Sequence, residues 1–325
     1  MKILIRLPNW LGDVVMSTAF IKSVKQIYPD ARIDVIIKKE LGGLVDLIGG
    51  LQTAHLFSKQ EYKGLTGAYR FGKNLRSEKY DLFFNLPSSL TSAVMAWASG
   101  AKKRIGYGAE GGFFLLTKAY KKPTNVHRVD EYISLLEQFT SRTITDRQVK
   151  LNIDAPPQPN KKVLINFNSE ASSRRMPVHK GKELINLLAA EFPGVTFTFI
   201  GTLKEKAFIE EVCENVRNRD HIENSAGSTN LVELCRLMAG AIAILTTDSG
   251  PAHLANSLGT PTIVLFGAGN EQNTAPYNKH KLTILRCGQL SCEPCVRNTC
   301  ELFGVPKCLE LIENLNIISS LKLFL

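Results

Sequence analysis

Short apolar runs alternate with amphipathic stretches along the first half of the chain. The strands that this pattern predicts lie at residues 2–7, 32–37, 54–58 and 80–86. Between them, apolar residues recur at helical spacing, as they do from Val15 to Ile27, and a closing helix is predicted at residues 125–139. Because parallel neighbours in a sheet need a long crossover connection, alternating strands and helices indicate a parallel sheet covered on both faces.

The same pattern restarts in the second half. Its predicted strands lie at residues 163–168, 196–201, 241–247 and 260–266, and its predicted helices at residues 180–192, 204–217, 230–238 and 252–258. Between the halves, residues 155–162 (Ala-Pro-Pro-Gln-Pro-Asn-Lys-Lys) are the most linker-like stretch of the chain. The sequence therefore predicts an α/β protein of two facing Rossmann-like domains, residues 1–154 and 155–325, with the last helix a candidate to pack back on the first domain.

Composition narrows the classes of ligand. Lys and Arg number 40 against 30 Asp and Glu, and the formal net charge of +10 favours anionic partners such as nucleic acid, phosphorylated lipid or a nucleotide sugar. No apolar run reaches the roughly 18–20 residues that span a bilayer, and residues 1–20 lack a signal-peptide pattern. We therefore expect a cytoplasmic protein whose charge is compatible with peripheral contact at the inner membrane.

The loop after the first strand reads Asn9-Trp10-Leu11-Gly12-Asp13 and precedes a helix. Ligands of open α/β sheets collect outside the carboxyl ends of the strands, which makes this loop a candidate site. Gly12 permits tight backbone geometry. Asp13 has two interpretations: an N-cap, worth roughly 1 kcal/mol of helix stability, or a general base at the mouth of the sheet. Spacing alone favours the N-cap.

A second loop, Thr247-Asp248-Ser249-Gly250, joins the strand at residues 241–247 to a helix that carries His253 in its first turn. A helix N-terminus offers unpaired N–H groups and a partial positive charge, so a diphosphate fits here. Capping of the helix by Asp or Ser is an equally good interpretation. His253 is by default a surface residue, and the alternative is that it faces the same ligand.

A third loop combines hydroxyls with guanidinium groups in Ser172, Ser173, Arg174 and Arg175. Arginine binds phosphate oxygens in bidentate fashion and can offset the charge of a leaving group without a metal. The alternative interpretation is a solvated basic loop, which is the usual environment of adjacent arginines. Both interpretations stay open at the level of the sequence.

Five of the seven cysteines lie close together near the C-terminus: Cys287, Cys292, Cys295, Cys300 and Cys308. A zinc ribbon usually needs two close cysteine pairs, and this segment has one, the pair in Cys292-Glu-Pro-Cys295. Reduced thiols that pack a loop are therefore favoured over a metal site or disulfides. We expect no metal and no cofactor.

Taken together, these motifs resemble the lipopolysaccharide heptosyltransferases of the ninth glycosyltransferase family, most closely the heptosyltransferase II group. The segments that carry the resemblance lie at residues 7–13, 104–107, 174–177 and 247–253. The resemblance implies the B-type glycosyltransferase fold. It also implies that the first domain binds the acceptor, with Asn9, Trp10 and Gly12 on that side, and that the second domain binds ADP-heptose.

The resemblance also assigns roles to residues. Asp13 matches the catalytic base of the family, whereas Asp248, Ser249, Gly250 and His253 match its donor-binding loop. The reaction implied is an inverting, metal-independent transfer of heptose to an acceptor of the lipid A-Kdo-heptose type. Two residues depart from the family pattern: Arg174 stands where a lysine is usual, which changes hydrogen-bond geometry, and Met176 replaces a usual tryptophan, which removes stacking.

Three alternative functions receive different degrees of support from the sequence. The first is a transferase that uses another nucleotide sugar, because Rossmann-like domains do not dictate the sugar. A nicotinamide oxidoreductase is disfavoured, because neither half shows Gly-x-Gly-x-x-Gly after its first strand. A non-enzymatic anion or nucleic-acid binder fits the charge, but no nucleic-acid-binding motif is present, and we expect no nucleic-acid partner.

Overall fold

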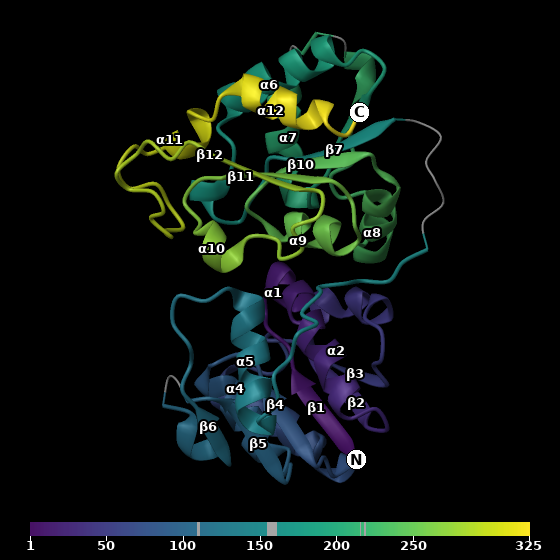
Figure 1. Ribbon diagram of the computed structural model, residues 1–325, viewed down its shortest axis with the longest axis vertical. Helices are drawn as coiled ribbons and strands as arrows, with labels where there is room; N and C mark the ends of the chain where they lie inside the picture. Colours follow the sequence, from purple (N-terminus) through teal and green to yellow (C-terminus); the bar gives the residue numbers. More distant parts are fainter. Residues whose placement is uncertain (109–110, 155–160, 215, 218) are drawn as a thin grey trace. The chain divides into compact units, whose positions relative to one another are not determined.

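The computed structural model describes residues 1–108, 111–154, 161–214, 216–217 and 219–325. The chain divides into two compact units, Met1–Asn152 and Ile153–Leu325. Each unit is built around one sheet (Figure 1). The linker-like stretch that the sequence places between the halves falls largely on residues 155–160, which lie outside the described residues.

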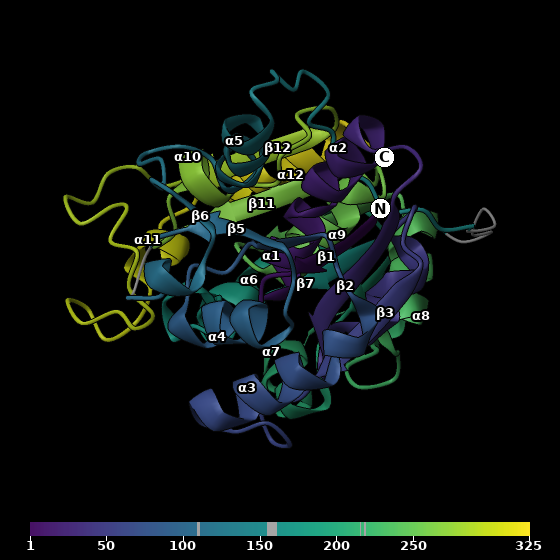
Figure 2. The same ribbon diagram turned by 90° about the horizontal axis from the view of Figure 1, so that it is seen from below.

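The N-terminal unit contains a six-stranded parallel sheet in the order β3-β2-β1-β4-β5-β6, in which β1, β2 and β3 lie side by side (Figure 2). Its strands are β1 (Lys2–Arg6), β2 (Arg32–Lys38), β3 (Thr53–Phe57), β4 (Leu82–Asn85), β5 (Lys103–Tyr107) and β6 (Lys118–Tyr120). Its helices are α1 (Leu11–Met16), α2 (Thr18–Ile27), α3 (Gly64–Asn74), α4 (Leu90–Ala98) and α5 (Arg128–Thr140). The strand order changes direction between β1 and β4.

The C-terminal unit repeats this arrangement in the order β12-β11-β10-β7-β8-β9, again with parallel neighbours. Its strands are β7 (Lys162–Asn166), β8 (Thr196–Phe199), β9 (Ile222–Asn224), β10 (Ala243–Thr247), β11 (Thr262–Phe266) and β12 (Leu282–Arg286). Its helices are α6 (Val178–Glu191), α7 (Lys206–Cys213), α8 (Leu231–Gly240), α9 (Gly250–Ser257), α10 (Glu271–Thr274), α11 (Lys307–Glu310) and α12 (Asn314–Lys322). Here the order changes direction between β7 and β10.

Short 3₁₀ helices complete the connections: η1 (Lys39–Leu47), η2 (Arg76–Glu78), η3 (Phe113–Leu115), η4 (Ser172–Arg174), η5 (Leu203–Glu205) and η6 (Arg219–His221). Among the described helices, none combines the length and the apolar character that crossing a bilayer requires.

Strand alternation sets the core of the C-terminal unit. Ile263 and Leu265 of β11 pack into a cluster that includes residues of α6, α7 and α12, whereas Val264 and Phe266 pack on the other face with Ala252 of α9. Helix α12 contacts β11 and β12 of its own unit, as both views show (Figures 1 and 2). Helices therefore cover both faces of the sheet, as the parallel topology requires.

Each strand that the sequence predicts is present, with ends that differ by at most two residues. Four further strands were not predicted: β5, β6, β9 and β12. Strand β5 begins with charged Lys103 and Arg104, so only its last three residues are buried. The other three lie at sheet edges, where a strand needs little apolar surface.

The helix predicted from Val15 to Ile27 is two helices, α1 and α2, that meet at Ser17. The hydroxyl of Ser17 donates to the carbonyl oxygen of Val14 at 2.7 Å, and the hydroxyl of Thr18 donates to that of Val15 at 2.8 Å. These side chains compete with the backbone for helix carbonyls, which favours a break at this point. The apolar spacing continues through the break, so periodicity alone missed it.

Candidate functional site

The loop between β10 and α9 lies where the strand order of the C-terminal sheet changes direction. Strand β10 ends at Thr247 and α9 begins at Gly250, so Asp248 and Ser249 form the turn. The neighbouring strand β7 ends at Asn166, whose side-chain amide donates to the hydroxyl of Ser249 at 2.8 Å. Such a crevice is the usual ligand site of an open α/β sheet.

The start of α9 receives no cap from its N-cap residue, Ser249. The hydroxyl of Ser249 is turned toward the sheet, where it donates to the carbonyl oxygen of Thr247 at 3.1 Å. Pro251 lies in the first turn and has no N–H to lose. The capping interpretation of Ser249 is thus not what the contacts show, and the first N–H groups of α9 remain suited to an anion.

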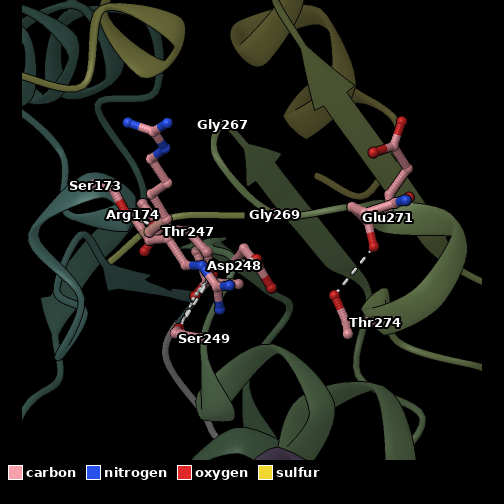
Figure 3. Close-up of polar contacts among 12 residues, drawn as sticks. Ser173, Arg174, Thr247, Asp248, Ser249, Gly267, Gly269, Glu271 and Thr274 are labelled. Atoms are coloured by element: carbon pink, nitrogen blue, oxygen red, sulfur yellow. Dashed lines mark hydrogen bonds and ion pairs between the residues drawn. The ribbon is translucent and has the colours of Figure 1, made fainter. Parts of the chain in front are cut away.

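Asp248 is a buried carboxylate beside this helix start, with 4% of its surface exposed. The Arg174 guanidinium Nε lies 3.5 Å from Asp248 Oδ2, and no hydrogen bond reaches that oxygen (Figure 3). Burial raises the pKa of Asp248 to about 6; Arg174 and Arg286 oppose this shift in pKa, and Glu271 adds to it. The carboxyl group therefore has an unused oxygen and a pKa close to neutrality.

Two residues that sequence reasoning missed, Arg286 and Glu271, influence the pKa of Asp248 through their charges. Arg286 donates from Nη1 to the carbonyl oxygen of Gly267 at 2.8 Å, from Nη2 to that of Gly269, and from Nε to Glu271 Oε1 at 3.2 Å. A Cβ at Gly269 would collide with Asp248 Oδ2. Figure 3 shows Glu271 beyond Gly269 from Asp248. The only sequence signal was Gly267-Ala-Gly269 directly after a predicted strand.

The Ser172–Arg175 segment is not a solvated basic loop. Ser173 is buried, and its hydroxyl donates to the carbonyl oxygen of Arg297 at 2.5 Å. Ser172 donates to the carbonyl oxygen of Asn298 at 3.3 Å. The two arginines diverge: Arg174 meets Asp248, whereas Arg175 stacks on the ring of Phe208 and donates to the carbonyl oxygen of Ser169. The serines anchor the loop, and Arg174 alone of the pair contacts Asp248 in the described structure.

The remaining residues of this group line the same strand ends. Thr247 is fully buried, and its hydroxyl donates to the carbonyl oxygen of Asn168 at 3.0 Å. His253 is 7% exposed, so the default expectation of a surface histidine was wrong. Burial follows from its place in the first turn of α9, on a helix that packs against β10 and β11.

Asp13 occupies the first turn of α1, but it is not the N-cap of that helix. Trp10 is the N-cap residue and makes no side-chain cap. Instead, Asp13 Oδ1 lies 3.6 Å from Arg128 Nε on α5, and Tyr132 on the same helix supplies a hydrogen bond. The N-cap interpretation that spacing favoured was therefore wrong, because a partner from a distant helix holds the carboxylate.

The surroundings of Asp13 set its basicity. Burial raises the pKa of this carboxyl; Arg128 lowers the pKa, Glu131 raises it, and the hydrogen bond from Tyr132 lowers it. The net effect is a pKa above the ordinary value for aspartate. A raised pKa makes the ionised form a better proton acceptor, which suits a general base.

The residues assigned to the acceptor side surround the start of α1. Asn9 accepts a hydrogen bond from Arg6 Nη2 at 2.5 Å through its side-chain oxygen. Trp10 is 62% exposed, so its ring is available at the surface. Gly12 lies inside α1.

Comparison with known proteins identifies the family. Residues 68–305 match glycosyltransferase family 9 (heptosyltransferase), which is well over half of the chain. The chain belongs to glycosyltransferase family 9. It is 29% identical over 311 aligned positions to lipooligosaccharide heptosyltransferase 2 of Haemophilus influenzae, and the match covers 88% of each chain.

Solved structures share the fold of this family 9 protein. ADP-heptose lipopolysaccharide heptosyltransferase II of Escherichia coli has a TM-score of 0.84 at 23% identity, covering 100% of this chain and 98% of that one. E. coli heptosyltransferase WaaC with ADP-2-deoxy-2-fluoro heptose has a TM-score of 0.77 at 16% identity, covering 99% of each chain. The resemblance inferred from the sequence motifs and the fold class inferred from the periodicity are both confirmed.

The cysteine-rich segment of this glycosyltransferase contains free thiols throughout its described residues. Four of them, Cys292, Cys295, Cys300 and Cys308, line one small cavity. No group of three or more His, Cys, Asp or Glu side chains in the described parts of the chain is arranged to hold a metal ion. Cys308 is buried, and burial raises the pKa of its thiol to about 11.

We predict that removing Arg128 raises the pKa of Asp13 further, because the guanidinium favours the ionised carboxylate. Arg128→Gln and, to a smaller extent, Tyr132→Phe should shift the carboxyl resonance of Asp13 to titrate at higher pH in ¹³C NMR. The acidic limb of a pH–rate profile that depends on ionised Asp13 should move to higher pH with it. Arg147→Gln, which removes a guanidinium from two other carboxylates of α5, is the control. An unchanged Asp13 titration in Arg128→Gln would contradict this account.

We predict that Asp248→Asn stabilises the fold at neutral pH. The pKa of Asp248 is about 6 in the fold against an ordinary value of 3.8, so its contribution to stability is greatest below about pH 4 and is lost as the pH rises through 6. The variant should therefore gain up to about 3 kcal/mol in the free energy of unfolding over the parent protein between pH 4 and pH 7.5. Urea denaturation at both pH values measures this, with exposed Asp220→Asn as the control. If the variant and the parent protein differed in free energy of unfolding by the same amount at both pH values, this account would be contradicted.

Proposed function

We propose that this family 9 glycosyltransferase transfers heptose from ADP-heptose to the inner core of a lipopolysaccharide precursor. The observation that carries the proposal is the uncapped start of α9 beside Asp248 and Arg174, at the strand ends where α/β sheets bind ligands. The sugar is suggested by the relatives: one is a lipooligosaccharide heptosyltransferase, and the WaaC structure contains ADP-2-deoxy-2-fluoro heptose.

In this proposal the C-terminal unit binds the donor. The diphosphate lies against the first N–H groups of α9 at Ser249 and Gly250, and Arg174 neutralises charge on its oxygens. Asp248, with its unused oxygen, and His253 face the sugar hydroxyls. Ser172, Ser173, Thr247 and Arg175 maintain the loop geometry through the carbonyl contacts described above.

The N-terminal unit binds the acceptor and supplies the base. Asp13 accepts the proton of the acceptor hydroxyl as its oxygen forms a bond to the anomeric carbon of heptose. The bond from that carbon to the diphosphate breaks, and ADP leaves from the opposite face, which inverts the configuration. Arg174 and the start of α9 stabilise the charge that develops on ADP, a role that a metal ion would otherwise serve. Transfer is therefore proposed to be independent of metal.

We propose that the protein is cytoplasmic and contacts the anionic inner-membrane surface transiently. The lysines on and around β5 and β6 are candidates for this contact, and they differ in their own contacts. Lys102 pairs with Asp81 and Lys122 with Glu131, whereas Lys118 and Lys121 are exposed. Phe113 and Phe114, on the turn before β6, are 59% and 68% exposed. Exposed aromatic rings beside lysines suit the interface of an anionic bilayer.

Donor and base are tested in one transfer assay. The parent protein should transfer heptose from ADP-heptose to a truncated Kdo-heptose core acceptor and use other nucleotide sugars poorly, with no loss on adding a chelator. Asp13→Asn should lower kcat by roughly a hundred- to ten-thousandfold while its affinity for ADP stays unchanged. Asp30→Asn, an exposed carboxylate of the same unit, should retain full activity. Near-normal turnover by Asp13→Asn would remove Asp13 from the base role.

Membrane contact is tested by co-sedimentation with vesicles. Binding to vesicles that contain anionic phospholipid should exceed binding to neutral vesicles and weaken as salt rises. Replacing Phe113 and Phe114 by serine, or Lys118 and Lys121 by glutamate, should reduce it. The same lysine-to-glutamate replacement at Lys204 and Lys206, which are exposed in the C-terminal unit, measures the effect of net charge alone. Binding insensitive to both salt and the Phe113/Phe114 change would contradict the proposed contact.

A further inference from the structure

A buried arginine lies where the N-terminal sheet changes direction, between β1 and β4. Arg6 is the last residue of β1 and is 2% exposed. Its guanidinium donates only to neutral oxygens in the described contacts: the carbonyl oxygens of Leu7 and Ile36 and the side-chain oxygen of Asn9. Its Nε has no hydrogen-bond partner.

The charge of Arg6 is not balanced by a carboxylate in the described structure. Arg128 meets Glu131, Arg174 meets Asp248 and Arg286 meets Glu271, but Arg6 has no such ion pair among the described residues. Burial lowers the pKa of Arg6 to about 10, so the guanidinium stays protonated at neutral pH. A buried charge is costly unless it is paired, and an anion arriving at this edge would offset that cost.

Other polar atoms with unused hydrogen-bonding capacity lie along the same strand ends. Asn85 ends β4 and is the register partner of Arg6 across the sheet. It is 1% exposed, and its Oδ1, which can accept a hydrogen bond from a hydroxyl but cannot donate one to an anion, makes no hydrogen bond. Ser88, in the loop that leads to α4, has a buried hydroxyl that is likewise unpartnered. The corresponding edge of the C-terminal sheet, between β7 and β10, carries Asn166 and the Asp248 loop.

We propose that the edge formed by Arg6, Asn9 and Ser88 binds an oxyanion, either a carboxylate or a phosphate, carried by the acceptor. This proposal rests on the glycosyl transfer proposed above and deepens it by naming a substituent of the acceptor. Asn9, which is partly exposed, provides a direct contact, and the unpartnered hydroxyl of Ser88 is a second donor. Arg6 acts as a positioning residue: it supplies positive charge and holds the oxygen of Asn9, so that the Asn9 amide N–H groups are left to face the anion.

The place of this anion site gives it a role in transfer. Asn9 lies four residues before Asp13, on the loop that opens α1. An acceptor held by its anionic substituent at Asn9 would have its sugar ring fixed relative to the base on the same loop. Charge recognition would then govern the affinity for the acceptor, while the donor, bound by the other unit, would be unaffected.

The site is tested by changing Arg6 in the protein and, separately, the anionic groups of the acceptor. Arg6→Gln should raise KM for an intact Kdo-containing acceptor by about ten- to a hundredfold and leave KM for ADP-heptose unchanged. An acceptor whose carboxylates are reduced and whose phosphates are removed should show a similar rise with the parent protein, and no further rise with Arg6→Gln. Arg32→Gln, which removes a guanidinium from the opposite end of the same sheet, is the control. Additive losses, or an unchanged KM in Arg6→Gln, would overturn the proposal.

A binding measurement keeps this test independent of transfer. The chain has two tryptophans, so Trp97→Phe leaves Trp10, the neighbour of Asn9, as the fluorescent reporter. Inorganic phosphate at constant ionic strength should change its emission saturably, and Arg6→Gln should abolish this change. Should no acceptor be glycosylated by the parent protein, the proposed function fails and the emission change still decides whether the anion site exists. If phosphate changed the emission but transfer to the neutral acceptor were normal, the site would bind free phosphate and not the acceptor. That result would also overturn the proposal.

Folding of the variant is the remaining control. If Arg6→Gln does not fold, Asn9→Asp and Asn9→Ala take its place, because Asn9 is only partly buried. The carboxylate of Asn9→Asp should repel an oxyanion, so this variant should raise KM for the intact acceptor more than Asn9→Ala does. It should have no such excess effect on the neutral acceptor. Equal effects of the two variants on the intact acceptor would contradict an anion site.

Discussion

Incompletely paired charge at the carboxyl ends of parallel strands is the constraint on which both units depend. Burying an ionised group is unfavourable unless nearby groups offset it, and Asp248 is compensated only in part by Arg174. The residual cost appears as a raised pKa and as an oxygen without a hydrogen bond. Such a group is available to a ligand in a way that a fully paired carboxylate is not, which explains why the donor is assigned to this edge.

The topology explains why these groups lie together. In each unit the two central strands, β1 and β4 or β7 and β10, are followed by helices that pack on opposite faces of the sheet, so the loops at their carboxyl ends border a crevice. Loops from two neighbouring strands therefore meet there. The two edges differ in sign: the C-terminal one carries a buried carboxylate and a helix start, and the N-terminal one carries a buried guanidinium. That difference fits a donor bound through hydroxyls and diphosphate and an acceptor bound through an anion.

The candidate base depends on a long-range contact rather than on its own helix. Asp13 begins α1, yet its pKa is raised by burial and moderated by Arg128 and Tyr132 of α5, more than a hundred residues later in the chain. Helix α5 packs against α1 and α2, which brings these side chains to Asp13. No local pattern around Asp13 could have separated a base from an N-cap, because either role shows in the sequence only as a carboxylate near the start of a helix. The motif resemblance supplied the role, and the contacts excluded the cap.

The sequence by itself determined the strands and helices of the central sheet, because apolar periodicity reports burial directly, and the loops at the strand ends, because Gly, Pro, Asp and Asn mark them. It did not reveal strands β5, β6, β9 and β12, the break at Ser17, or the contacts of Arg6, Glu271 and Arg286. Each of these depends on which neighbour a side chain meets, and parallel topology makes those neighbours distant in sequence: Arg6 lies beside Asn85, and Asp248 beside Arg174. Local propensity can place a charge on the chain, but only the tertiary structure decides whether that charge is paired.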